Sequence, residues 1–190
     1  MTPPHATEPS RLGHLLRDHD RRGLRFERHL RHTPQVVWTA ITDSEHLRAW
    51  LPTDIVGERR SGAPVRLPFW PEVVERFEIP EPDSYVDGEI VVYDPPTTFA
   101  WNWGGDLIRF ELEAVDGGTL LTLTTWLGPA PVEPWQAAAG WHSCLDHLGA
   151  ARPRRHLGGR EWRSHLARAD VPGGVRAGAR RQLRPRAALS

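Results

Sequence analysis

The sequence predicts an α+β fold in which a helix packs on one face of an antiparallel sheet. Apolar and polar residues alternate over most of residues 54–127, a period of two that is typical of half-buried strands. Residues 134–152 form a single helical segment with a proline at its start and another just past its end. Strands followed by a helix are typical of α+β domains. No segment repeats at a period of about 20–50 residues, which argues against a solenoid.

The first strand is expected in the stretch GLRFERHLRHTP. Leu24, Phe26 and Arg28 alternate there with charged or polar residues. Thr33 is expected to cap a short helix that begins at Pro34, because the first helical position needs no N–H. A second short helix is predicted in SEHLRAWL, capped by Asp43 or Ser44 and ended by Pro52 (residues 43–52).

A run of antiparallel strands is expected next. Ser61-Gly62 and the Asp-Gly-Gly sequence at 116–118 are typical of hairpin turns. The acidic stretch 71–83 contains three prolines, so it is predicted to be a loop or an irregular edge strand. The predicted strands cover residues 54–60, 63–70, 84–94, 97–104, 107–115 and 119–127.

Charge is distributed unevenly along the 190 residues, although the net charge is zero. All 24 basic residues are arginines; 11 of them lie in residues 152–190 with two acidic residues, and the other 13 lie in residues 1–151 with 22 acidic residues. A basic tail raises the question of nucleic acid. This one contains a single aromatic residue, Trp162, and no binding motif, so nucleic acid is not the expected partner.

The composition also indicates the cellular compartment of the protein. The sequence has no apolar run of about 18 residues and no apolar core in its first residues, so neither a membrane span nor a secretory signal is expected. A single cysteine, Cys144, excludes an internal disulfide and suits a reducing compartment. The sequence therefore predicts a cytoplasmic protein, with Cys144 as a small buried side chain on the last helix.

Several motifs together resemble one known superfamily. They are LRFERHLRHTPQVVWTAITDSEHLRAWLP, YDPPTTFAWNW, FELEAVDGGTLLTLT and GWHSCLDHL, in that order along the chain. These stretches resemble the SRPBCC superfamily (START or birch-pollen-allergen-like), and within it the branch named after the activator of heat-shock protein 90 ATPase. The resemblance implies a helix-grip fold: a curved antiparallel sheet wrapped around a long C-terminal helix, with two short helices after the first strand and a cavity between sheet and long helix.

The resemblance also sets domain limits. It covers residues 24–151, which are expected to form the domain, after an N-terminal extension at 1–23 that is partly disordered. The superfamily pattern stops at residue 151, where the chain becomes rich in Arg, Gly and Ala. Residues 152–190 are therefore expected to be poorly ordered or to result from a change of reading frame.

The expected function is binding of a small hydrophobic molecule in that cavity, without catalysis, cofactor or metal. Nine tryptophans supply large apolar surfaces, and the alternation in FAWNW places three aromatic rings on one face of a strand. The same rings could instead fill the space as ordinary core, and the sequence leaves both alternatives open. The residues expected to line the site are Phe69, Phe99, Trp101, Trp103, Phe110, Trp141 and Leu145.

Two further functions remain open. A cyclase- or dehydratase-type enzyme would need His142, oriented by Asp146 four residues later, together with Tyr85 or Tyr93 inside the cavity. A protein-interaction module would use the sheet or the acidic stretch 72–83. The sequence shows no hydrolase motif or P-loop. Because His147 lies five residues after His142, the two would point apart on a helix and are poor joint metal ligands.

Overall fold

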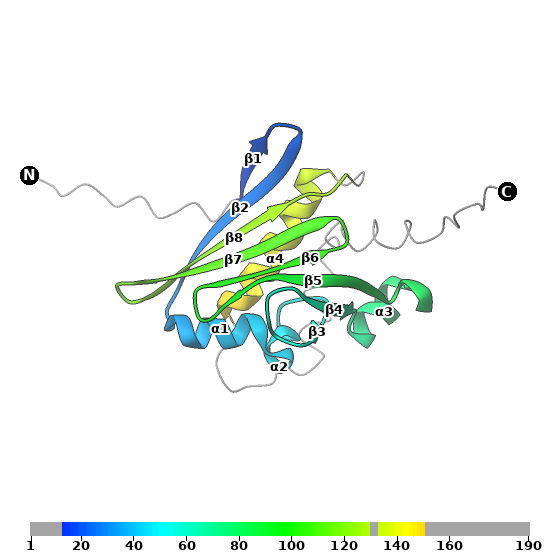
Figure 1. Cartoon of the computed structure of the whole chain (residues 1–190), viewed down its shortest axis with the longest axis horizontal. Coiled ribbons are helices and arrows are strands. Elements are labelled where there is room, and N and C mark those ends of the chain that lie inside the picture. The colour runs from blue at the N-terminus through cyan, green and yellow to red at the C-terminus, as the bar shows by residue number, and fades with distance from the viewer. Residues whose placement is uncertain (1–12, 130–132, 151–190) are drawn as a thin grey trace, which may run out of the picture.

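A computed structural model describes residues 13–129 and 133–150. It contains an eight-stranded antiparallel sheet in the order β1-β2-β8-β7-β6-β5-β4-β3. The sheet is curved and open, and helix α4 crosses one of its faces (Figure 1). The strands are β1 His14–Asp18, β2 Arg21–Leu30, β3 Val56–Gly57, β4 Ala63–Pro68, β5 Tyr85–Asp94, β6 Thr98–Trp103, β7 Asp106–Val115 and β8 Gly118–Trp126.

The helices lie where the predicted α+β, helix-grip fold requires them. Two short helices connect β2 to β3, and the long helix follows the last strand. This confirms the predicted fold class and the two short helices after the first long strand. The helices are α1 Pro34–Thr42, α2 Ser44–Leu47, α3 Pro71–Phe77 and α4 Pro134–Ala150, with a 3-10 turn η1 at Glu81–Asp83.

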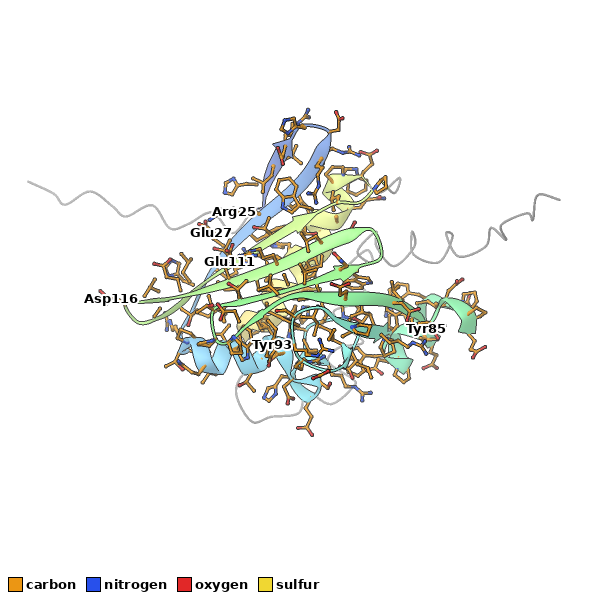
Figure 2. The ribbon with its side chains drawn as sticks, viewed as in Figure 1. Arg25, Glu27, Tyr85, Tyr93, Glu111 and Asp116 are labelled. Atoms are coloured by element: carbon orange, nitrogen blue, oxygen red, sulfur yellow. The ribbon has the colours of Figure 1, made fainter. Side chains whose placement is uncertain are left out.

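The strand register produces one continuous apolar face. Phe26, Leu123, Phe110 and Phe99 lie opposite one another across β2, β8, β7 and β6, and each is at most 1% exposed. Side chains alternate between the two faces of a strand, so the intervening residues point away from α4. Figure 2 shows charged side chains of β2 and β7 among these, including Glu111. The sheet thus has a charged outer face and an apolar inner face.

The helix starts follow local chemistry. Pro34 takes the first position of α1, and Thr33 precedes it as predicted, although its side chain makes no capping hydrogen bond. Asp43 caps α2 by accepting a hydrogen bond from the Glu45 N–H at 2.9 Å. α4 begins at Pro134 as expected.

The acidic stretch 71–83 is not the predicted loop or edge strand. It forms α3 and η1, because Pro71 can occupy a first helical position without losing a hydrogen bond and Val73 is then buried against the core. The strand predicted at 54–60 is also shorter than expected, since only Val56–Gly57 pairs with β4.

An additional strand, β1, precedes the predicted domain. It lies within the segment 1–23 that the sequence analysis assigned to an N-terminal extension, and it pairs with β2 from His14↔Arg25 to Asp18↔Arg21. Only its central residue, Leu16, is partly buried, so it has no apolar alternation by which to recognise it. Residues 1–12 and the tail 152–190, with the expectations placed on them, lie outside the described residues.

Two non-glycine residues, His19 and Glu78, have positive φ, and the second of them lies at the end of a helix. Glu78 ends α3 in the left-handed region, with φ 49° and ψ 42°, and its side chain is exposed. A residue with a Cβ atom disfavours this conformation, whereas glycine adopts it readily and is common just after helices.

Replacing Glu78 with glycine should therefore stabilise the protein, by about 1 kcal/mol. The matched control is Glu75→Gly, inside the same helix, where glycine should cost about 1 kcal/mol. Chemical denaturation of both variants measures the difference. A loss of stability in both would contradict the strain at Glu78.

Candidate functional site

The seven residues expected to line a ligand site come together in one buried cluster. Each is at most 6% exposed. On the sheet, Phe99 and Trp101 have ring centroids 4.9 Å apart, and Trp101 stacks on Phe110 with centroids 5.8 Å and planes 12° apart. The register confirms that β6 and β7 present these rings to the same face, since Phe99 lies opposite Phe110.

Trp141 connects this sheet surface to α4. Its ring meets Trp103 at 6.2 Å and Phe110 at 6.3 Å between centroids, both edge to face. Phe69, which follows β4, approaches Trp103 at 6.4 Å, and Leu145 is buried one turn beyond Trp141. We call these seven residues the aromatic layer: Phe69, Phe99, Trp101, Trp103, Phe110, Trp141 and Leu145.

Two polar groups inside the aromatic layer are unsatisfied. The indole N–H groups of Trp101 and Trp103 are buried and find no hydrogen-bond acceptor among the described residues. Elsewhere in the fold the indoles of Trp50 and Trp70 donate to backbone carbonyls at 2.9 and 2.8 Å. A buried donor without an acceptor costs about 1–3 kcal/mol, so such groups are uncommon in a plain core.

A polar cluster lies beside the aromatic layer, between β2 and α4. Arg28, with only 6% of its side chain exposed, donates to His142 Nδ1 at 3.2 Å and lies 3.6 Å from Asp146 Oδ1. His142 Nε2 is 3.3 Å from Asp146 Oδ2, so the two predicted helix residues do interact. Arg28 was not among the residues predicted for this site. The alternation of Leu24, Phe26 and Arg28 could have indicated it, because residues two apart on a strand lie on the same face of the sheet.

The polar cluster fixes the tautomer of His142. A guanidinium only donates hydrogen bonds, so Nδ1 must accept and the proton resides on Nε2, facing Asp146. Both ring nitrogens are thereby engaged within the cluster. The arrangement suits a link between α4 and β2 better than proton transfer to a molecule in the aromatic layer.

The tyrosines of the predicted catalytic set lie elsewhere. Tyr85 and Tyr93 occupy opposite ends of β5 (Figure 2). Tyr85 packs against the guanidinium of Arg66, 4.1 Å from the ring centroid, and Tyr93 packs against Trp38 with ring centroids 5.2 Å apart. The cyclase- or dehydratase-type alternative needs a tyrosine beside His142 and Asp146, whereas both tyrosines lie on β5, three strands away from β2, which His142 and Asp146 contact through Arg28.

A half-buried carboxyl group lies at the end of the aromatic layer. Asp106 is opposite Trp103 in the β6–β7 pair and accepts a hydrogen bond from the Gly128 N–H at 2.7 Å. Burial raises the pKa of Asp106 above its ordinary value, and the Gly128 hydrogen bond opposes part of that effect. Among residues 13–129 and 133–150, no group of three or more His, Cys, Asp or Glu is placed to hold a metal ion.

A family model described as "Activator of Hsp90 ATPase homolog 1-like protein" matches residues 31–151. The chain belongs to this family. The match spans α1 through α4 and includes all seven residues of the aromatic layer. A search of curated proteins finds no significant match. No helix in the described part of this family member is long and apolar enough to cross a membrane.

Solved structures share the fold of this family member. A conserved protein of unknown function from Enterococcus faecalis matches with a TM-score of 0.59 and 20% identity, covering 82% of this chain and 88% of that one. CalU16 from Micromonospora echinospora matches at 0.54 and 20%, covering 88% and 94%. A protein from Rhodobacter sphaeroides matches at 0.54 and 23%, covering 73% and 95%. At these identities the likeness establishes the fold alone.

Asp106 should make the stability of this family member depend on pH. An acid whose pKa is raised by folding favours the folded state below its unfolded pKa, and that contribution is lost as the pH rises through the folded pKa. At neutral pH the half-buried carboxylate therefore lowers the stability of the folded state, and Asp106→Asn removes this cost while its amide oxygen still accepts from Gly128.

We expect Asp106→Asn to be at least as stable as the wild type at pH 7, and to lose this advantage as the pH falls toward 4. Thermal unfolding across the pH range measures the difference. Asp116→Asn, in the exposed β7–β8 turn, is the control. A variant that is less stable at pH 7 than at pH 4, relative to the wild type, would contradict the account.

The polar cluster should contribute to the attachment of α4. Asp146→Ala removes one carboxylate that lies 3.6 Å from the buried guanidinium of Arg28, which should cost about 1–3 kcal/mol. Adding Arg28→Met should recover part of that loss, because the buried charge is then gone. The exposed pair Arg25–Glu27 supplies the control, since Glu27→Ala should cost less than about 1 kcal/mol. Equal losses for Asp146→Ala and Glu27→Ala in denaturant titrations would refute this role.

Proposed function

We propose that this family member is a cytoplasmic binding protein that takes up a small hydrophobic molecule between the sheet and α4, without catalysing a reaction. The observation that carries the proposal is the position of Trp141. It is a single large ring on α4 whose edge contacts join the helix to the rings of β6 and β7. Rotation of this one side chain would open a space beside Trp103, Phe110 and Leu145.

The two sides of the aromatic layer make different ring contacts. The sheet rings are placed by the strand register and stack on each other, as Trp101 does on Phe110. Trp141 comes from α4 and meets Trp103 and Phe110 edge to face. We infer that a ligand takes the place of the Trp141 ring while the sheet rings stay in position.

Burial of the ligand supplies the binding energy. An aromatic group that buries about 150–250 Å² gains about 4–6 kcal/mol at 25 cal/mol per Å². Because the displaced Trp141 ring loses burial of the same kind, the net gain is smaller, and dissociation constants of about 1 mM or weaker are expected before any polar contact. The family description names an Hsp90 ATPase activator, but the candidate site on this chain is interior, which favours a small molecule over a protein.

Titration of the purified protein with naphthalene and with larger polycyclic hydrocarbons tests the proposal. We expect a saturable change in tryptophan fluorescence, with an affinity that Trp141→Phe alters several-fold. Trp135→Phe is the matched control, because Trp135 lies on the same helix but is 62% exposed. Absence of a saturable change in the wild type, or equal effects of the two substitutions, would contradict the proposal.

The thiol of Cys144 gives a second readout from the same helix. It is buried against the sheet, and burial raises its pKa to about 12, so alkylating reagents reach a reactive thiolate only when α4 separates from the sheet. A ligand that binds while α4 stays packed on the sheet makes this separation rarer, so the alkylation rate should fall as the fraction of protein with bound ligand rises. An unchanged rate at saturating hydrocarbon would count against the site.

A further inference from the structure

The unsatisfied indole groups of the aromatic layer point to the chemistry of the ligand, and this inference rests on the proposed function. Trp101 is fully buried and Trp103 is 6% exposed. Neither Nε1–H finds an acceptor among the described residues, although indoles elsewhere in the fold do. An indole nitrogen donates and never accepts, so what the site lacks is an acceptor.

The two donors lie close together on one strand. Trp101 and Trp103 are two residues apart on β6, so their side chains leave the same face about 7 Å apart. Trp101 lies opposite Ile108 on β7, and Ile108 lies opposite Thr125 on β8, so the three residues form one row across the sheet. The buried hydroxyl of Thr125 also has no partner among the described residues. A carbonyl oxygen has two lone pairs, so one such oxygen placed between the two rings can accept from both indole N–H groups.

The charges around these groups favour a neutral acceptor over an anion. Arg28, a cation on the inner face, lies 3.6 Å from the carboxylate of Asp146. It pairs with Leu121, four residues along β8 from Thr125 in the row of Trp101. The nearest acidic group in the register, Asp106, lies opposite Trp103 and would repel a carboxylate. A buried anion without a counterion is far costlier than a neutral carbonyl.

We propose that Trp101 and Trp103 donate hydrogen bonds to the carbonyl oxygen of an uncharged, otherwise apolar ligand. The aromatic layer holds the hydrocarbon part of this ligand, and the indole N–H groups orient its oxygen toward β6. The site should prefer a ligand with the carbonyl over an analogue without it. The analogue leaves both buried indole N–H groups without an acceptor, and that costs free energy.

Isosteric probe pairs test this assignment. Each pair replaces C=O with C=CH₂: acetophenone with α-methylstyrene, 2-acetylnaphthalene with 2-isopropenylnaphthalene, and 9-fluorenone with 9-methylenefluorene. The hydrocarbon member is the more hydrophobic, so burial alone predicts that it binds more tightly. We expect the ketone to bind about tenfold more tightly, a difference of about 1.4 kcal/mol.

Two variants and one spectrum locate the effect. Trp101→Phe or Trp103→Phe should abolish the preference for the ketone. The affinity of the same variant for the hydrocarbon shows whether the packing has changed. Trp135→Phe, on the exposed side of α4, should leave the preference intact. In ¹⁵N spectra of the wild type, the indole N–H signals of Trp101 and Trp103 should lie further downfield with the ketone than with its hydrocarbon partner, because both probes carry aromatic rings but only the ketone accepts a hydrogen bond. This measurement needs no variant to fold.

The outcomes separate the two proposals. If no probe of any size binds, the proposed function fails, and the present inference fails with it. Two results would mean that a hydrophobic site exists but its indole groups do not hydrogen-bond to a carbonyl. One is that the hydrocarbons bind as tightly as the ketones or more tightly. The other is that the two indole signals do not respond to the ketones. Either result overturns this inference alone.

Discussion

Phe26, Leu123, Phe110 and Phe99 lie in one row across four strands, and this alignment determines what the rest of the chain must do. A shift of one residue in any pair would turn that strand's apolar residues outward. With the register fixed, the sheet has an apolar face that is several strands wide and must be covered. Helix α4 covers it, and the aromatic layer is the contact surface that results.

Arg28 is a buried charge on this largely apolar surface. Its guanidinium remains there because Asp146 and His142 reach it from α4, which also determines where the helix lies over β2. Burying an ion pair adds little net stability compared with apolar packing, so its effect is chiefly on position. The aromatic contacts between Trp141 and the sheet depend on that position.

The fold was largely predictable because its main elements have strong local patterns. The alternation of β6 and β7 fixed which rings share a face, and prolines marked the starts of α1 and α4. The failures have physical reasons: β1 pairs through its backbone while leaving its side chains exposed, and proline at 71 was compatible with a helix as well as a break.

The candidate site was predictable in part for the same reason. Periodicity identified the seven residues of the aromatic layer, but no local pattern reveals that Arg28 meets a helix 114 residues later. The unpaired state of the Trp101 and Trp103 indoles was equally invisible, because it depends on which carbonyls approach each ring in three dimensions.

An open sheet, unlike a closed barrel, ends in two strands with one free side each. In this protein those strands are β1 and β3. β3 contains only two residues, and β1 carries Arg17 and Asp18 on a segment whose side chains are mostly exposed. Short or charged border strands are poor templates for pairing with another chain, so this architecture limits edge-to-edge association while leaving the apolar face available for α4.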